Sequence, residues 1–255
     1  MITSSFDDRT KEIITPDDTI SQREKELARS FQIDTFIISF SHKLVDLLYE
    51  KGITEELGDL KIGSAAYENP VYRVKNSNVG VVLSGIGAPS AAAITEELFT
   101  LFKCRNYIVF GSCGALVDIP ESKIIVPTEA YRDEGVSYHY AGAADYITVK
   151  NATKLAGILD ELGVDHLEGK TWTTDAFYRE TTGNRDKRVR EGCICVEMEC
   201  SGLQALCDFR GLELYQFVYA ADSLNDSWSR RILGKMEMDS RLKYFYLALE
   251  IARRI

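Results

Sequence analysis

Two carboxylates one residue apart, Glu197 and Glu199, are the side chains whose types and spacing first point to chemistry. They follow the apolar run 193–196 and precede a helical pattern that begins near Ser201. If the run is a strand, both acids lie on one face and Met198 on the other, because strand side chains alternate. Carboxylates at a buried strand end are costly unless a ligand or a donor satisfies them. The pair is therefore either part of a binding site or a pair of solvated surface acids.

Two glycine-rich turns follow apolar runs and could bind an anion. Gly85-Ile86-Gly87 follows the run 79–84, and Gly111-Ser112-Cys113-Gly114 follows the run 106–110. Backbone N–H groups in such turns can approach an anion, and the start of a following helix helps. The first turn lacks the third glycine of the dinucleotide-binding fingerprint, so alone it is better interpreted as a tight turn between strand and helix. Two such ends gather at one edge of a parallel sheet, where ligands of open α/β folds bind.

The apolar pattern that must position these residues predicts an N-terminal arm and helix at 1–30 and one domain at 31–255. Buried strands are expected at 36–40, 79–84, 106–110, 169–174, 193–196 and 214–221. Helices are expected at 19–31, 41–51, 91–102, 151–162 and 201–209. Further expectations are a hairpin of 59–67 and 71–75 around the turn 68–70, a strand pair at 119–126 and 128–131, a loop at 132–144, and a largely helical stretch at 229–255.

Composition limits the classes of partner. The net charge of −9, from 30 basic and 39 acidic residues, argues against non-specific binding to nucleic acid. No run of about 18 apolar residues is present, so no membrane association is expected. The polar start of the chain is unlike a signal peptide, so the six cysteines are expected to be reduced in a cytoplasm. Cys193-Ile194-Cys195 resembles half of a metal clamp, but no second pair or nearby His completes it, so no metal is expected.

Four segments, in their order along the chain, resemble the nucleoside phosphorylase superfamily: Ser84–Ser90, Val109–Ala115, Val196–Cys200 and Ala220–Asp222. The resemblance implies an α/β fold, a single-domain three-layer sandwich with a twisted mixed central sheet flanked by helices. It also implies a pentosyltransferase that cleaves the N-glycosidic bond of a nucleoside, with a purine favoured and inorganic phosphate as acceptor. No cofactor is expected. The resemblance implies a homo-oligomer (dimer, trimer or hexamer).

The resemblance assigns the site residues to three groups. The ribose group is Glu197, Met198 and Glu199, the base group is Phe177, Tyr178 and Asp222, and the phosphate group is Gly87 and Ser112. Glu199 and Asp222 are the expected catalytic residues. Breaking the bond builds positive charge on the sugar, which a carboxylate stabilises, and an acid at Asp222 would protonate the leaving purine if burial or a neighbour keeps it protonated. The alternative for Asp222 is a helix N-cap.

The chain departs from the family in the arginines that hold phosphate. The run Ser39–Leu44 stands where a glycine-aspartate-proline turn and an arginine are usual, Val109 stands at the second arginine, and Asp59 falls near the arginine that a neighbouring subunit lends. The guanidinium clamp on phosphate is therefore expected to be absent. Partial replacements are Ser41, His42 or Lys43.

Three alternatives follow from this departure. The chain is a phosphorylase, a nucleosidase in which water replaces phosphate, or a non-catalytic nucleoside-binding relative. Thr181 and Gly183 stand roughly where uridine phosphorylases read uracil, which disfavours pyrimidines. Candidates for a basic partner of Asp222 are Arg230, Arg231 and Lys235.

Overall fold

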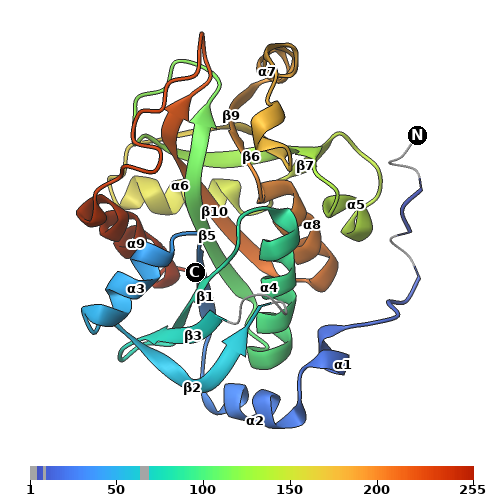
Figure 1. The fold of residues 1–255 in the computed structure, drawn as a ribbon, viewed down its shortest axis with the longest axis vertical. Helices are drawn as coiled ribbons and strands as arrows, with labels where there is room; N and C mark the ends of the chain where they lie inside the picture. The colour runs from blue at the N-terminus through green and yellow to red at the C-terminus, as the bar shows by residue number, and fades with distance from the viewer. Residues whose placement is uncertain (1–4, 8–9, 64–68) are drawn as a thin grey trace.

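A computed structural model describes residues 5–7, 10–63 and 69–255, and within them a mixed β-sheet is covered by helices (Figure 1). The strands are β1 Thr35–Ser39, β2 Thr54–Ile62, β3 Asn69–Val74, β4 Val79–Leu83, β5 Asn106–Ala115, β6 Ile124–Asp133, β7 Tyr146–Thr148, β8 His166–Thr174, β9 Cys193–Glu197 and β10 Glu213–Ser223. The helices are α1 Pro16–Thr19, α2 Gln22–Ser30, α3 His42–Glu50, α4 Ala88–Phe102, α5 Ser137–Tyr140, α6 Ala152–Glu161, the 3₁₀ helix η2 Phe177–Arg179, α7 Thr182–Arg190, α8 Cys200–Arg210 and α9 Met238–Ala252.

The sheet runs in the order β10-β6-β8-β9-β5-β1-β4-β3-β2. Strand β10 also pairs with β5, in parallel, so β5, β10, β6, β8 and β9 close into a ring from which β1 to β4 extend as an open sheet. Strand β1 is parallel to both β4 and β5, whereas β6 and β9 are antiparallel to their neighbours β10 and β5. The predicted single-domain α/β fold with a mixed, helix-flanked sheet is confirmed, and closure of the ring adds to it.

Two hydrophobic cores lie on the two faces of the open sheet. Ile37 of β1 packs into a core with residues of α3, α6 and α9, whereas Phe36 and Ile38 pack into the core shared with α2, α4 and α8. This alternation follows from the two-residue repeat of a strand. Because both faces are covered, β1 reads as a continuous apolar run, which is typical of parallel strands in α/β proteins.

The ends of four strands meet at one place. Ser39, the last residue of β1, is in register with Phe110 of β5, and Ser112 of β5 is in register with Tyr219 of β10. The end of β9 joins them, since Val196 pairs with Gly114. The expectation that both glycine-turn segments gather at one sheet edge is confirmed, because Leu83, just before the first segment, is in register with Ser39, and Ala88 N donates to Met198 O beyond the end of β9.

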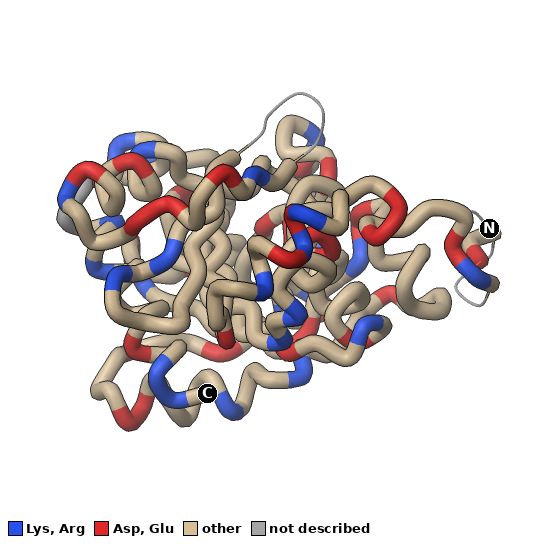
Figure 2. Tube along the Cα trace, turned by 90° about the horizontal axis from the view of Figure 1, so that it is seen from below, with Lys and Arg blue, Asp and Glu red and all other residues tan. Residues whose placement is uncertain are grey.

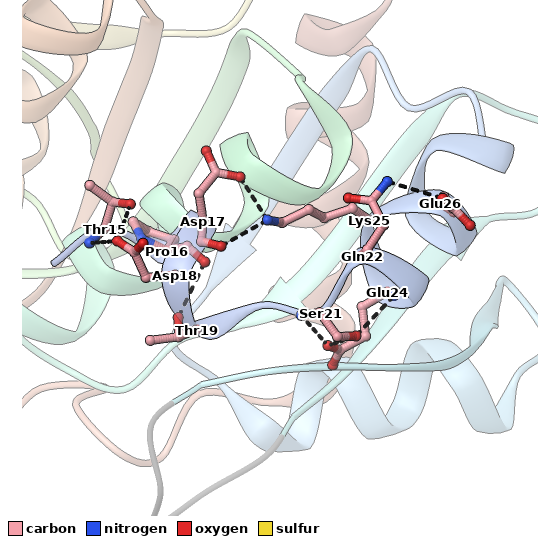
Figure 3. A network of polar contacts seen from close by, with 10 residues as sticks. All are labelled: Thr15, Pro16, Asp17, Asp18, Thr19, Ser21, Gln22, Glu24, Lys25 and Glu26. Atoms are coloured by element: carbon pink, nitrogen blue, oxygen red, sulfur yellow. Dashed lines mark hydrogen bonds and ion pairs between the residues drawn. The ribbon is translucent and has the colours of Figure 1, made fainter.

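The N-terminal segment is fixed by paired helix caps (Figure 3). The Ser21 hydroxyl accepts from Glu24 N at 3.2 Å, and the Glu24 carboxylate accepts from Ser21 N at 2.8 Å. Such a cap contributes about 1 kcal/mol. Lys25 pairs with the Asp17 carboxylate at 2.8 Å, which joins α1 to α2. Helix α2, predicted from residue 19, thus begins later, and its Ala28 is fully buried in the second core.

Three predicted segments are wrong in detail. Residues 119–131 are not a strand pair, because β6 is continuous through Pro127. A register shift between Pro127 and Ala130 accommodates the missing N–H. The predicted loop 132–144 contains the end of β6 and the short helix α5. Residue 68 of the predicted turn lies outside the described residues, and Asn69 and Pro70 already belong to β3, which forms the expected antiparallel pair with β2.

The C-terminal stretch is also less helical than predicted. Helix α9 begins only at Met238. Ser229 bridges back to Ser223, and the backbone takes left-handed angles at Arg231 (φ 45°) and Gly234 (φ 69°), which are incompatible with a continuous helix. These turns place α9 beside α3, at the left of Figure 1.

Positions of basic and acidic residues are interspersed along the described chain (Figure 2). Lys and Arg positions lie among Asp and Glu positions, and neither sign occupies a continuous face in that view. In the part of the chain that the structure describes, no helix combines the length and apolar character needed to cross a membrane.

Candidate active site

A cavity of about 480 Å³ lies where the strand ends meet. This volume is in the range of small-molecule sites. Seven of the eight residues predicted for the site line it: Ser112, Phe177, Tyr178, Glu197, Met198, Glu199 and Asp222. They come from β5, η2, the β9–α8 junction and β10, so the fold brings together segments more than 100 residues apart.

Glu197 is buried and fully engaged by protein donors. Its Oε1 accepts from Thr173 Oγ1 at 2.5 Å, and its Oε2 accepts from the backbone N–H groups of Glu199 and Cys200 at 2.9 and 2.8 Å. Gln216 Nε2 adds a contact at 3.3 Å. Burial raises the pKa of Glu197, and these four donors oppose the rise. The structure therefore makes Glu197 the anchor of the α8 N-terminus, and its predicted direct contact with ribose competes with these bonds.

Replacing Glu197 by Ala is expected to destabilise the fold strongly. The change leaves the buried donors of Thr173, Glu199 and Cys200 without an acceptor. Each unpaired buried donor costs about 1–3 kcal/mol. The free energy of unfolding, measured by urea denaturation, should fall by about 3 kcal/mol or more. Glu168→Ala, at an exposed position of β8, is the control and should stay within about 0.5 kcal/mol of the parent. An equally small effect at Glu197 would contradict the anchoring role.

Glu199 is held at the cavity wall by Gly87, the glycine that the resemblance assigned to the phosphate group. The Gly87 N–H donates to Glu199 Oε1 at 2.7 Å, and Ala88 N donates to Met198 O at 2.8 Å. Gly87 has φ 96°, a conformation that favours glycine, and caps the start of α4. The predicted phosphate contact of Gly87 competes with this bond, and Gly87 is not among the residues that line the cavity. In the structure, Gly87 orients the Glu199 carboxylate.

The acidity of Glu199 is shifted by its surroundings. The side chain is only 7% exposed. Burial, followed by the nearby charge of Glu197, raises its pKa to about 8. The bond from Gly87 opposes the rise only in part. These surroundings thus favour the protonated form of Glu199, whereas the donors around Glu197 favour its ionised form.

The aromatic residues predicted for the base lie on η2. Phe177 is 40% exposed and Tyr178 is 93% exposed, and their ring centroids are 4.8 Å apart in an edge-on arrangement. Both line the cavity. An exposed ring at a cavity mouth can stack against a flat heterocycle, which a core phenylalanine cannot do.

Asp222 lies at the end of β10 and is 4% exposed. Its Oδ2 accepts from Trp228 Nε1 at 3.0 Å. Burial raises its pKa, while Trp228 and the charge of Arg231 act in the opposite direction. The helix N-cap alternative is wrong, because the residues that follow Asp222 end the strand and then form bends. Of the three basic partners considered, Arg231 is the one whose charge acts on Asp222, and its Nη1 donates to Ile119 O at 2.7 Å.

Glu180 is a cavity residue that the sequence reasoning missed. It follows Phe177-Tyr178-Arg179 and lines the cavity as a half-buried side chain. Burial, and then the charge of Asp222, raise its pKa to about 7. Its position directly after two cavity aromatics was the only signal in the sequence. Glu180 and Asp222 together can hold a proton near neutral pH.

The expected phosphate end contains hydroxyl groups. Ser41 and Ser112 line it, whereas His42 and Lys43 are exposed outside it. The regions in which the family has phosphate-binding arginines are partly apolar in this chain. Leu44 lines the cavity, and Val109 is fully buried. Among the lining residues within the described ranges, Arg241 of α9 is the one cation.

One of the six cysteines, Cys113, lines the cavity, and burial raises the pKa of its thiol. All six are free and buried, and burial raises the pKa of the Cys193 thiol to about 11. Over the described ranges, no cluster of three or more His, Cys, Asp or Glu side chains is arranged to hold a metal ion.

A solved structure has the same fold. Purine nucleoside phosphorylase from Toxoplasma gondii in complex with immucillin-H superposes with a TM-score of 0.70 at 20% identity, covering 89% of this chain and 94% of that one. Two relatives are similar in sequence, both purine nucleoside phosphorylases of the DeoD type. The protein from Caldanaerobacter subterraneus subsp. tengcongensis is 29% identical over 70% of this chain and 78% of its own length, and that from Aliivibrio fischeri is 32% identical over 51% and 56%.

The family comparison spans most of the domain. The model of the phosphorylase superfamily matches residues 26–239, which include every cavity-lining residue except Arg241 and Tyr244 of α9. The order of the segments, the ring of strands and the carboxylates at the cavity wall agree with that match. The chain belongs to the phosphorylase superfamily.

Proposed function

We propose that this protein is a nucleoside phosphorylase, a pentosyltransferase that transfers the pentose of a nucleoside to inorganic phosphate. The observation that carries the proposal is the joint presence of Glu199, Asp222 and the exposed ring of Phe177 in one cavity. Family membership and the DeoD-type relatives support phosphorolytic cleavage of a purine nucleoside.

Glu199 and Met198 serve the sugar. As the glycosidic bond lengthens, positive charge develops on the ribose ring; this charge favours the ionised form of Glu199, and the carboxylate, fixed by Gly87, stabilises it. Met198 supplies an apolar contact for the sugar face. Glu197, anchored by Thr173, positions this pair through the backbone of residue 199.

Asp222, Glu180 and Phe177 serve the base. A purine leaves more easily when its ring nitrogen is protonated, so the site must supply a proton. The buried carboxyl of Asp222 is next to Glu180, whose pKa of about 7 lets the pair hold that proton at neutral pH. Phe177 and Tyr178 hold the ring at the mouth.

A change at Glu180 should move the pH profile. The pKa of Glu180 is about 7 and that of Asp222 is raised, so the proton that the leaving base needs is lost as pH rises and kcat/KM for a purine nucleoside falls. Glu180→Gln removes a negative charge beside Asp222, which lowers the pKa of Asp222. The alkaline limb of kcat/KM should therefore move to lower pH. Glu161→Gln, exposed at the end of α6, is the control; an unmoved limb in Glu180→Gln argues against the shared proton.

The direct test of the activity is base release from inosine, adenosine and methylthioadenosine, with and without phosphate. Release that requires phosphate is expected. Release at an equal rate without phosphate would establish a nucleosidase, an alternative favoured by the absence of the family arginines in the run 39–44 and at Val109. Thermal stabilisation by a nucleoside without any release would identify a non-catalytic relative.

We propose also that the enzyme works as a homo-oligomer in the cytoplasm. Tyr178 at the cavity mouth is 93% exposed and Trp228 is 60% exposed, which is an unusual cost for large apolar side chains. The six free, buried thiols suit a reducing compartment. Light scattering at two protein concentrations tests the assembly.

A further inference from the structure

The cavity combines an excess of negative charge with one positive group. Its carboxyl groups are Glu180, Glu197, Glu199 and Asp222. Its cation, among the residues that the structure describes, is Arg241. An anionic co-substrate entering such a site needs a cation to offset the carboxylates, because charges of like sign repel strongly at low local dielectric.

Arg241 reaches the cavity from α9, beside the start of α3. Its Nη1 donates to Ser41 Oγ at 3.0 Å, and its Nε has a long contact of 3.4 Å to Met236 O. No carboxylate among the described side chains lies within ion-pair distance of it. A guanidinium has five N–H donors, so most of its capacity remains for a ligand.

Hydroxyl groups converge on the same part of the cavity. Ser41 follows β1, Ser112 lies on β5, and Tyr219 is in register with Ser112 on β10. Ser112 is exposed to the cavity. Burial raises the pKa of Tyr219 to about 12, and the charge of Arg241 acts against this rise, which places the guanidinium near the ring hydroxyl. The carboxylates come from other segments: η2, the β9–α8 junction and the end of β10.

We propose that Arg241, supplied by the C-terminal helix, is the residue that binds the anionic co-substrate, a tetrahedral oxyanion such as inorganic phosphate, together with Ser41 and Ser112. The guanidinium groups that are missing from the run 39–44 and at Val109 are thus replaced from a distant part of the chain. Planar guanidinium groups bind two phosphate oxygens at once, which gives orientation as well as affinity. The inference rests on the proposed phosphorolysis and names its anion-binding residue.

The competing role is structural, since Arg241 also links α9 to Ser41 at the start of α3. Kinetics separate the two roles. In Arg241→Gln, the KM for phosphate at saturating nucleoside should rise about ten- to a hundredfold, the scale of a lost hydrogen bond to a charged group, with the KM for nucleoside little changed. Arg241→Lys should recover part of the loss, because it keeps the charge but not the paired donors. Lys243→Gln, exposed on the same helix, is the matched control.

The outcomes are distinguishable from those of the proposed function. A folded Arg241→Gln enzyme with the parental KM for phosphate overturns the inference and leaves phosphorolysis standing. If Arg241→Gln does not fold, Arg241→Lys carries the test, and a parental KM for phosphate in that variant overturns it. If the parent releases base without phosphate, phosphorolysis fails, and calorimetric titration with inorganic phosphate decides: binding by the parent that Arg241→Gln loses sustains the anion site, and no binding by the parent overturns it.

Discussion

Glu199→Gln is expected to lower kcat by a factor of about 10² or more, the scale of a lost electrostatic contact to a charged transition state. The amide keeps the size of the side chain and can still meet ribose hydroxyls, but it cannot offset the positive charge that develops on the sugar. Nucleoside affinity should therefore change less than turnover. Steady-state kinetics with a purine nucleoside measure both, and Glu168→Gln on the exposed side of β8 is the control. Unchanged turnover would remove Glu199 from the mechanism.

The same variant has a signature in stability. The pKa of Glu199 is raised from its ordinary 4.5 to about 8, so the folded protein holds this proton more tightly than the unfolded chain. The free energy of unfolding of the parent therefore falls as pH rises from about 4.5 through 8. In this range the carboxyl of residue 199 is ionised in the unfolded chain but stays protonated in the folded protein. Glu199→Gln removes this loss. Its melting temperature relative to the parent should be higher at pH 9 than at pH 5, and equal differences would contradict the shift.

The sequence predicted the place of the paired carboxylates but not their division of labour. The apolar run 193–196 put the carboxylates at a strand end but left open whether they are buried or solvated, and the structure buries both. The strand stops at Glu197, however, and Glu199 lies at the N-cap of α8. Their roles depend on Thr173, 24 residues away, and on Gly87, 112 residues away. Such partners follow from strand order and register, which local periodicity does not contain.

Arg241 and Glu180 are cavity residues that local sequence patterns did not predict. In the sequence, Arg241 lies within an apolar helical pattern that predicts only packing, and its approach to Ser41 spans 200 residues. The two left-handed residues that turn the chain before α9, Arg231 and Gly234, determine that approach. Glu180 precedes the polar helix α7 and resembles a solvated acid until burial by the cavity wall is known. Matching family motifs identifies only the residues that the chain shares with its family. It cannot identify residues at which the chain differs from that family.

Asp222→Asn is expected to reduce kcat/KM for a purine nucleoside by about 10²- to 10⁴-fold, the contribution of a positioned general acid. The amide retains the hydrogen bond geometry toward Trp228 in one rotamer, so the fold should persist. It has no proton to transfer at any pH near neutrality. The alkaline limb that Glu180 and Asp222 produce in the parent should also disappear from the residual activity. Far-ultraviolet circular dichroism checks the fold before kinetics are compared.

The decisive comparison uses a riboside whose leaving group needs no proton. A 4-nitrophenyl riboside departs as a stabilised phenolate, so Asp222→Asn should cleave it at nearly the parental rate while failing on purine nucleosides. Glu199→Gln should fail on both substrates, because charge develops on the ribose whichever group leaves. A loss on purine nucleosides alone in one variant and on both substrates in the other distinguishes the acid at the base from the carboxylate at the sugar. Equal losses on both substrates in Asp222→Asn would assign Asp222 to structure or to binding of the sugar instead of to departure of the base.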